Sequence, residues 1–119
     1  MEHAERERVI DTYFDAMDTT DTSEVRDLLA AEFTYVAGDG TTFVGEDAID
    51  RYIEEVRSLA DTHHEIEHLA HGDSASFAEG TVSGTGPGGD KIAVGFCDVF
   101  EFDEEDGTLA ALTVYINEK

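Results

Sequence analysis

The sequence predicts a single α+β domain over residues 1–119, with three N-terminal helices packed on a strongly bent antiparallel or mixed sheet. Two observations support this class. Apolar residues recur at three-to-four spacing in the first half and alternate every second residue in the second half. Turn signals rich in Gly, Asp and Pro divide the second half into long segments. A run of helices followed by a run of strands is typical of α+β architecture.

Three segments predict amphipathic helices, at residues 4–17, 21–33 and 46–60. In the second, Asp21 is the expected N-cap, with Glu24 three residues later. The apolar stripes are Val9, Ile10, Tyr13, Phe14 and Met17 in the first segment, Val25, Leu28 and Leu29 in the second, and Ala48, Ile49, Tyr52, Ile53, Val56 and Leu59 in the third.

The strands are predicted from alternation and from turns. A short strand is expected at 32–37, before a Gly-Asp-Gly turn at 38–40. Long strands joined by tight turns predict antiparallel pairing and a strong bend. The four long strands are predicted at residues 64–71, 75–84, 91–103 and 108–117.

The charge balance limits the partners. The chain carries 29 Asp and Glu against 7 Lys and Arg, a net charge of −22, spread along its whole length. Such an acidic surface predicts a protein that works in concentrated salt. It argues against binding nucleic acid or an anionic membrane, since both require a basic patch. A DNA-mimic role is the alternative.

Whole-chain signals predict a cytoplasmic protein. No apolar run approaches the roughly 20 residues that span a bilayer, and the start "MEHAERERVI" does not resemble a signal peptide. The single Cys97 forms no internal disulfide and is expected to be a small buried filler in a strand.

Residues 64–68 spell H-E-x-x-H, the zinc-protease signature. On a helix, His64 and His68 would share one zinc ion, whereas on a strand they lie about 13 Å apart. The segment follows a complete helix and ends in a Gly-Asp turn, which favours a strand. Strand parity places His64, Ile66 and His68 on one face and His63, Glu65, Glu67, Leu69 and His71 on the other. The histidines are then expected to be partly exposed.

Residues 84–89 satisfy G-x-G-x-x-G, the dinucleotide-loop pattern. A phosphate loop must open a helix, and the residues that follow are typical of a strand. Pro87 and the glycines around it therefore predict a hairpin turn.

The stretch "GFCDVFEF" places one carboxylate among aromatic rings. On a strand, Phe96, Asp98, Phe100 and Phe102 share one face. Burial of this face would raise the pKa of Asp98 and leave a neutral acid that donates a hydrogen bond. Tyr13 lies in the apolar stripe of the first helix, and the two groups could converge on a ligand oxygen. The alternative is that they only satisfy each other.

Along residues 4–117 the order of elements resembles the nuclear transport factor 2-like superfamily, a cone-shaped α+β domain. This superfamily includes ketosteroid isomerase, limonene epoxide hydrolase, scytalone dehydratase and the SnoaL-like polyketide cyclases. The resemblance is carried by the order of "VIDTYFDAM", "VRDLLAAEFTYVAG", "FVGEDAIDRYIEEV", the "HGDSA" hairpin and "FCDVFEFDEEDGTLAALTVYIN".

The ketosteroid isomerase pattern matches at two positions, which implies Tyr13 and Asp98 as the oxyanion-binding pair. The position of its general-base aspartate holds Ala37 instead, and Asp39 is expected to face water. The limonene epoxide hydrolase pattern requires two acids bridged by an arginine inside the cone. It fits poorly, since all five arginines fall in predicted helices: Arg6, Arg8, Arg26, Arg51 and Arg57.

Strand parity and the resemblance together predict an apolar cone interior for a small apolar or aromatic ligand. The predicted lining is Met17, Tyr35, Tyr52, Phe77, Phe96, Leu112, Val114 and Ile116. The side faced by Glu79 is undetermined. The opposite face, with Val99 and Val82, is the expected homodimer surface. No sequence feature calls for a metal or another cofactor.

Two functions follow from these expectations. In the first, Tyr13 and Asp98 stabilise an enolate-type oxygen in an isomerase-like or cyclase-like pocket. In the second, the domain binds a ligand or serves as a dimeric scaffold without catalysis, which the alanine at position 37 favours.

Overall fold

A computed structural model describes residues 1–117 and shows an α+β fold on a mixed six-stranded sheet. The strands are β1 (Leu29–Val36), β2 (Thr42–Val44), β3 (Ala60–His71), β4 (Ala75–Thr85), β5 (Lys91–Asp103) and β6 (Thr108–Asn117). Their order across the sheet is β2-β1-β6-β5-β4-β3. β1 and β6 pair in parallel, and the other neighbours are antiparallel.

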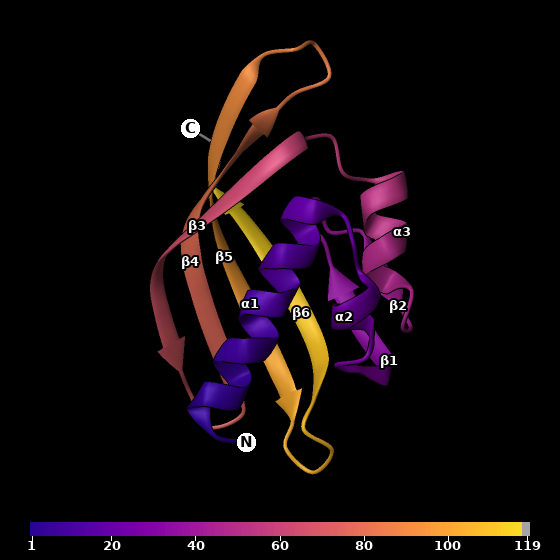
Figure 1. Cartoon of the computed structure of the whole chain (residues 1–119), viewed down its shortest axis with the longest axis vertical. Helices are drawn as coiled ribbons and strands as arrows, with labels where there is room; N and C mark the ends of the chain where they lie inside the picture. The colour runs from indigo at the N-terminus through magenta and orange to yellow at the C-terminus, as the bar shows by residue number, and fades with distance from the viewer. Residues whose placement is uncertain (118–119) are drawn as a thin grey trace.

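The first helix, α1 (His3–Thr19), lies along the face of the sheet that curves around it (Figure 1). Its buried side matches the predicted stripe, because an apolar residue every three to four positions returns to one side of a helix. The residues of this stripe are Val9, Ile10, Tyr13, Phe14 and Met17, all buried.

The second helix is shorter than predicted. α2 spans only Ser23–Arg26, and Leu29 already belongs to β1. The reason is strand pairing, since Leu29 lies opposite Leu109 of β6 and the amide of Leu109 donates to the carbonyl of Leu28 (2.9 Å). These bonds to a distant strand compete with helix propagation over a segment whose apolar spacing suits either state.

The third helix, α3 (Ala48–Glu55), also ends earlier than predicted. The guanidinium of Arg57 donates to the carbonyls of Met17 (2.7 Å) and Leu59 (2.9 Å) and so ties the segment after α3 to the end of α1. β3 begins at Ala60, opposite Thr85, four residues before its predicted start. The other long strands agree with their predicted bounds to within one residue.

β3 carries a bulge that the sequence did not reveal. Ile66 pairs with Gly80 but His68 pairs with Glu79, so Glu67 is an extra residue. At this point the two backbones approach so closely that a Cβ on Gly80 would lie 1.9 Å from the carbonyl oxygen of Glu65. The bulge reverses the alternation of side chains along the rest of β3.

The H-E-x-x-H segment is therefore a strand, as predicted, but its predicted faces are wrong. His64 pairs with Val82 of the inner face, whereas His68 pairs with Glu79. The outer face also includes Phe77, which is 41% exposed. After the bulge, Leu69 and His71 pair with buried residues of β4 rather than with its outer face.

The glycine-rich segment at 84–89 forms the predicted hairpin turn. The amide of Gly86 donates to the carbonyl of Asp90 (2.8 Å), and the amide of Gly89 donates to the carbonyl of Gly86 (2.9 Å). Gly89 adopts a φ of 87°, which favours glycine. No helix N-terminus follows, so the segment lacks the geometry of a phosphate loop.

Arg6 joins the N-terminal helix to two turns of the sheet. Its guanidinium is 2% exposed and donates to the carbonyls of Gly72 (2.7 Å) and Asp73 (2.6 Å) and to Oε1 of Glu104 (2.6 Å). These bonds anchor α1 across the end of the sheet.

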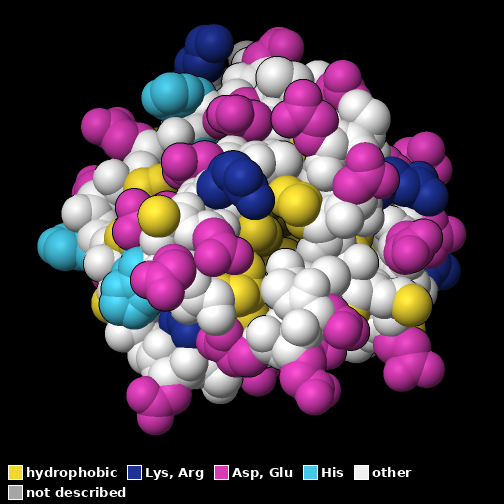
Figure 2. Space-filling view, turned by 60° about the horizontal axis from the view of Figure 1, so that its bottom comes forward, with side chains coloured by type: hydrophobic (Ala, Val, Ile, Leu, Met, Phe, Trp, Pro, Cys, Tyr) yellow, Lys and Arg dark blue, Asp and Glu magenta, His cyan; other side chains and the backbone are white. Residues whose placement is uncertain are grey.

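The surface carries the acidic residues. Figure 2 shows Asp and Glu side chains spread over the face it presents, with few Lys and Arg side chains among them. Within the described part of the chain, no helix is long and apolar enough to cross a membrane.

Candidate functional site

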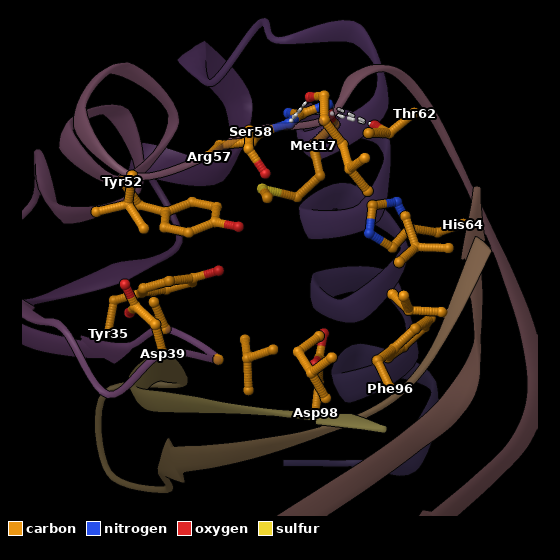
Figure 3. A pocket seen from close by; sticks show the side chains of 18 of the residues that line it. Met17, Tyr35, Asp39, Tyr52, Arg57, Ser58, Thr62, His64, Phe96 and Asp98 are labelled. Atoms are coloured by element: carbon orange, nitrogen blue, oxygen red, sulfur yellow. Dashed lines mark hydrogen bonds between the residues drawn. The ribbon is translucent and has the colours of Figure 1, made fainter. Parts of the chain in front are cut away.

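A cavity of about 450 Å³ lies between the inner face of the sheet, α1 and the segment that follows α3 (Figure 3). Its walls are mostly apolar, with polar groups placed singly among them, as in many small-molecule sites. It is lined by Tyr13, Met17, Tyr35, Ala37, Gly38, Asp39, Tyr52, Val56, Arg57, Ser58, Leu59, Thr62, His64, Val82, Ile92, Val94, Phe96, Asp98, Val114 and Ile116.

Asp98 is a buried acid without a protein partner. The carboxyl is 3% exposed, and its cross-strand neighbours are Ala78 and Val114, neither of which offers a side-chain donor. It makes no hydrogen bond with any residue between 1 and 117, and its Oδ1 is fully buried. Burial raises the pKa of Asp98 well above its ordinary value, which favours the neutral, proton-donating form of the carboxyl.

Three tyrosines stand beside this carboxyl. The hydroxyls of Tyr13 and Tyr35 lie 3.1 Å apart, both buried, and either can donate to the other. The rings of Tyr35 and Tyr52 pack with their centroids 4.9 Å apart. Burial, followed by the neighbouring Tyr35 and Asp98, raises the pKa of Tyr13 well above its ordinary value. The tyrosines are therefore neutral donors.

The opposite wall carries a histidine bound to an aspartate. Nδ1 of His64 lies 2.5 Å from Oδ1 of Asp18, and the backbone amide of His64 donates to Oδ2 of the same carboxylate (3.0 Å). Oγ1 of Thr62 also donates to Asp18 (2.9 Å). Figure 3 shows His64 across the cavity from the hydroxyls of Tyr35 and Tyr52. His64 is partly exposed, as predicted, but its side chain lines the cavity, which the sequence did not indicate.

Arg57 is a second polar wall residue that the sequence did not single out. Besides the two carbonyls described above, its guanidinium donates to Oγ1 of Thr62 (2.6 Å). It therefore braces the segment after α3 against α1 and β3. Among residues 1–117 it bridges no pair of acids, whereas the limonene epoxide hydrolase pattern would require such a bridge.

The resemblance implies a general-base carboxylate at position 37, where this chain has alanine. Ala37 is buried and contributes a methyl group to the wall. Asp39 lies at the cavity rim, exposed to solvent, and accepts a hydrogen bond from the amide of Thr41 (2.9 Å). This bond lowers the pKa of Asp39, which makes its carboxylate a weaker base.

The structure brings together most of the residues predicted for the interior. The predicted residues that line the cavity are Tyr13, Met17, Tyr35, Tyr52, Phe96, Asp98, Val114 and Ile116. Leu112 is fully buried but lies outside the lining. Phe77 is a correction, because strand pairing with Ala70 and Val99 turns it to the outer face. The prediction that Val82 lies on the outer face is also wrong, since its side chain lines the cavity.

Sequence reasoning missed the pairing of Asp18 with His64. The only local signal is that Thr62 and His64 share the inner face of β3, while the contact itself spans 46 residues. Nothing in the spacing of α1 indicates that Asp18, in its last turn, meets β3.

The outer sheet face holds three side chains that could ligate a cation. Glu67, His68 and Glu79 are all exposed, and their ligand atoms lie within 4.8 Å of one another. This settles the side faced by Glu79. Because the group lies on the other side of the sheet, it is separate from the cavity.

The family model of the SnoaL-like domain matches residues 10–112. A search of curated protein sequences finds no match. Among solved structures, a putative SnoaL-like polyketide cyclase from Shewanella denitrificans superimposes with a TM-score of 0.82 at 15% identity, covering 98% of this chain and 92% of that chain.

Two further structures share the fold. A protein of unknown function from Burkholderia pseudomallei, described as nuclear transport factor 2-like, gives a TM-score of 0.84 at 18% identity, covering 98% of this chain and 92% of that one. An epoxide hydrolase from Mycobacterium tuberculosis, resembling limonene epoxide hydrolase, gives a TM-score of 0.77 at 18% identity, covering 96% of this chain and 84% of that one. At these identities the similarity establishes the fold.

Proposed function

Because this chain belongs to the SnoaL-like domain family of the nuclear transport factor 2-like superfamily, we propose that its cavity binds a small apolar or aromatic carbonyl compound. In this proposal the cavity is the interior of the cone that the family resemblance implies. Tyr13 and Asp98 donate hydrogen bonds to the ligand oxygen and stabilise it as charge develops there.

The observation that carries the proposal is the unpartnered carboxyl of Asp98. A buried polar group without a hydrogen bond costs about 1–3 kcal/mol of stability. A bound ligand would supply the partner that Oδ1 of Asp98 lacks within residues 1–117. A neutral carboxyl in an apolar wall is a stronger donor to an oxyanion than to a neutral carbonyl. The bound oxygen is therefore stabilised most when it is charged.

The tyrosine pair supports the same role. When Tyr35 donates to Tyr13, the proton of Tyr13 is free to point at a ligand. The two donors would then flank one oxygen, from α1 and from β5. Apolar neighbours such as Phe96 and Val114 favour a flat hydrophobic body for the ligand.

The test is the binding of a fluorescent naphthol in molar potassium chloride. A naphtholate resembles an enolate, and its emission distinguishes the ionised from the neutral dye. We expect tight binding of the ionised form, weakened at least tenfold, about 1.4 kcal/mol, in Tyr13→Phe and in Asp98→Ala. Asp98→Asn retains an N–H donor and is expected to lose less.

The matched control is Tyr115→Phe, which removes the hydroxyl of a tyrosine that is 59% exposed on the outer face. Its affinity should equal that of the native protein. Absence of naphthol binding by the native protein would contradict the proposal. So would equal affinities in all folded variants.

A second candidate, a ligand-binding domain without catalysis, is favoured by Ala37. The methyl group at this position cannot accept a proton. In that case the cavity would bind the naphthol but would not change the proton exchange of a bound ketone.

The domain is also proposed to form a homodimer through the outer sheet face. Phe77 and Tyr115 are exposed there, with Val99 between the strands that carry them. An apolar group on this acidic surface is best covered by a like surface. Light scattering should give twice the mass of the chain for the native protein and a monomer for Phe77→Asp. A native monomer at micromolar concentration would contradict the dimer.

A further inference from the structure

The titratable side chains that line the cavity offer few candidates for a general base. They are Tyr13, Tyr35, Asp39, Tyr52, Arg57, His64 and Asp98. Burial raises the pKa values of the tyrosines and of Asp98, which favours their protonated forms. Asp39 lies in solvent and accepts a backbone bond, and Arg57 has no lone pair to offer. His64 remains.

The hydrogen bonds of His64 determine which nitrogen is basic. Asp18 accepts the bond at Nδ1, so the proton of the neutral ring lies there. Nε2 then carries the lone pair, and within residues 1–117 it has no hydrogen-bond partner. Figure 3 shows one ring nitrogen of His64 directed into the cavity. The geometry therefore presents a free lone pair to a bound ligand.

Asp18 and His64, called the dyad below, are held firmly in this orientation. Asp18 accepts bonds from the ring and the backbone amide of His64 and from the hydroxyl of Thr62. The ring of His64 packs between Phe14 and Phe96, with centroid distances of 5.1 and 5.5 Å. These contacts hold the imidazole and the carboxylate in place, as a proton-transfer site requires.

The electrostatics favour a neutral histidine beside an ionised aspartate. Burial lowers the pKa of His64, and the hydrogen bond and charge of Asp18 oppose this only in part. The charged or titratable groups facing His64 are Asp18 from α1, Arg57 after α3 and His63 on its own strand, and the last two also disfavour the charged ring. Burial would raise the pKa of Asp18, but its bonds from His64 and Thr62 outweigh burial and lower it.

We propose that His64 is the general base of this cavity and Asp18 its positioning residue, so that the chain catalyses proton transfer at the carbon next to a ligand carbonyl. This rests on the function proposed above, in which Tyr13 and Asp98 hold the oxygen. The dyad would take the role of the carboxylate that the resemblance implies at position 37, and it acts from another wall of the cavity.

The step is balanced without a further reactant. Nε2 of His64 takes a proton from the carbon, the C–H electron pair forms a carbon–carbon double bond, and the carbonyl π pair moves to the oxygen. The enolate oxygen accepts hydrogen bonds from Tyr13 and Asp98. The imidazolium, stabilised by the charge of Asp18, returns a proton to a carbon of the enolate, which restores the ketone or its isomer.

The probe for this step is 2-tetralone, a cyclic ketone with an acidic C–H, incubated with the protein in deuterated buffer. Deuterium uptake at carbon reports proton abstraction, because the imidazolium exchanges with solvent. We expect the native protein to accelerate uptake, and His64→Ala to slow it by about 100-fold or more. Free imidazole should restore part of the rate in His64→Ala.

Asp18→Asn distinguishes positioning from folding. An asparagine amide can donate to Nδ1, which moves the ring proton to Nε2 and removes the base, so the rate should fall about tenfold or more. The acid limb of the rate profile should also move to lower pH, because a charge that favoured the imidazolium is lost. Imidazole should not rescue this variant. The matched control is His68→Ala, an exposed histidine on the outer face of the same strand, whose rate should match the native protein.

Naphthol binding separates the two hypotheses. Suppose that the native protein and His64→Ala bind naphtholate equally. If both then give the same rate of deuterium uptake by 2-tetralone, or if neither accelerates it, the base assignment is wrong and the oxyanion site stands. If the native protein binds no naphtholate, the oxyanion site itself fails. Binding retained and exchange lost only in the dyad variants would support both.

Discussion

The hydroxyl oxygens of Tyr13 and Tyr35 lie 3.1 Å apart in the buried wall of the cavity, joining α1 to β1. One hydroxyl must donate and the other accept, so the pair has one remaining proton for a ligand. When Tyr35 is the donor, the proton of Tyr13 is the one left for a ligand. Tyr35 is the partner that the sequence did not assign to Tyr13.

Tyr35→Phe is expected to weaken naphtholate binding by about two- to tenfold, the value of one ordinary hydrogen bond. The reason is that Tyr13 loses the neighbour that orients its proton. Titration of the fluorescent naphthol measures the effect. Binding equal to that of the native protein would mean that Tyr13 donates independently of Tyr35.

Asp98→Asn is expected to change how stability depends on pH. Burial raises the pKa of Asp98, so the folded protein holds a proton that the unfolded chain releases above about pH 4. The free energy of unfolding therefore falls as pH rises, by up to about 1.4 kcal/mol per pH unit, until the folded carboxyl itself ionises.

Asparagine carries no such proton, so this contribution to the slope should disappear in the variant, with the greatest relative gain in stability at high pH. Urea unfolding at pH 5, 6, 7 and 8 measures the difference between the two proteins. Parallel curves across this range would show that Asp98 ionises as readily in the folded protein as in the unfolded chain.

Arg6→Met is expected to lower the free energy of unfolding by about 2 kcal/mol or more. The methionine fills similar volume but leaves the carbonyls of Gly72 and Asp73 without donors, at about 1–3 kcal/mol for each group left unsatisfied. Arg8→Met is the control, since Arg8 is exposed on the same helix. Equal denaturation midpoints for the two variants would show that the hydrogen bonds of Arg6 do not stabilise the fold.

Gly80→Ala is expected to disrupt the bulge in β3. The added Cβ would lie 1.9 Å from the carbonyl oxygen of Glu65, which is backbone and cannot rotate away. Forcing the strands apart should cost about 1–3 kcal/mol. Gly95→Ala is the control, because its Cβ would meet no atom closer than 3.6 Å. Thermal unfolding of both variants measures the contrast, and a harmless Gly80→Ala would contradict the close approach.

Salt is expected to stabilise the protein. With 29 acidic and 7 basic residues, the folded chain repels itself, and the Debye length falls from about 10 Å at 0.1 M salt to about 3 Å at 1 M. The melting temperature should therefore rise between 0.1 and 1 M potassium chloride. Sucrose at matched osmolality controls for effects unrelated to charge. An unchanged melting temperature would argue against adaptation to concentrated salt.

The sequence by itself determined the elements whose period is local. The stripe of α1 and the alternation along β5 and β6 follow from backbone geometry, which repeats every 3.6 or 2 residues whatever the rest of the chain does. The same alternation placed Asp98 on the buried face with Phe96 and Phe100. The resemblance then added Tyr13 as its companion.

The tertiary structure decided what depends on distant segments. The pairing of Leu29 with β6 ends α2 early. The bulge in β3, where the strand closely approaches Gly80, places His68 on the opposite face of the sheet from His64. Asp18 contacts His64 because the end of α1 lies beside the start of β3. Such contacts are selected by packing and hydrogen bonding across many residues, and no local period encodes them.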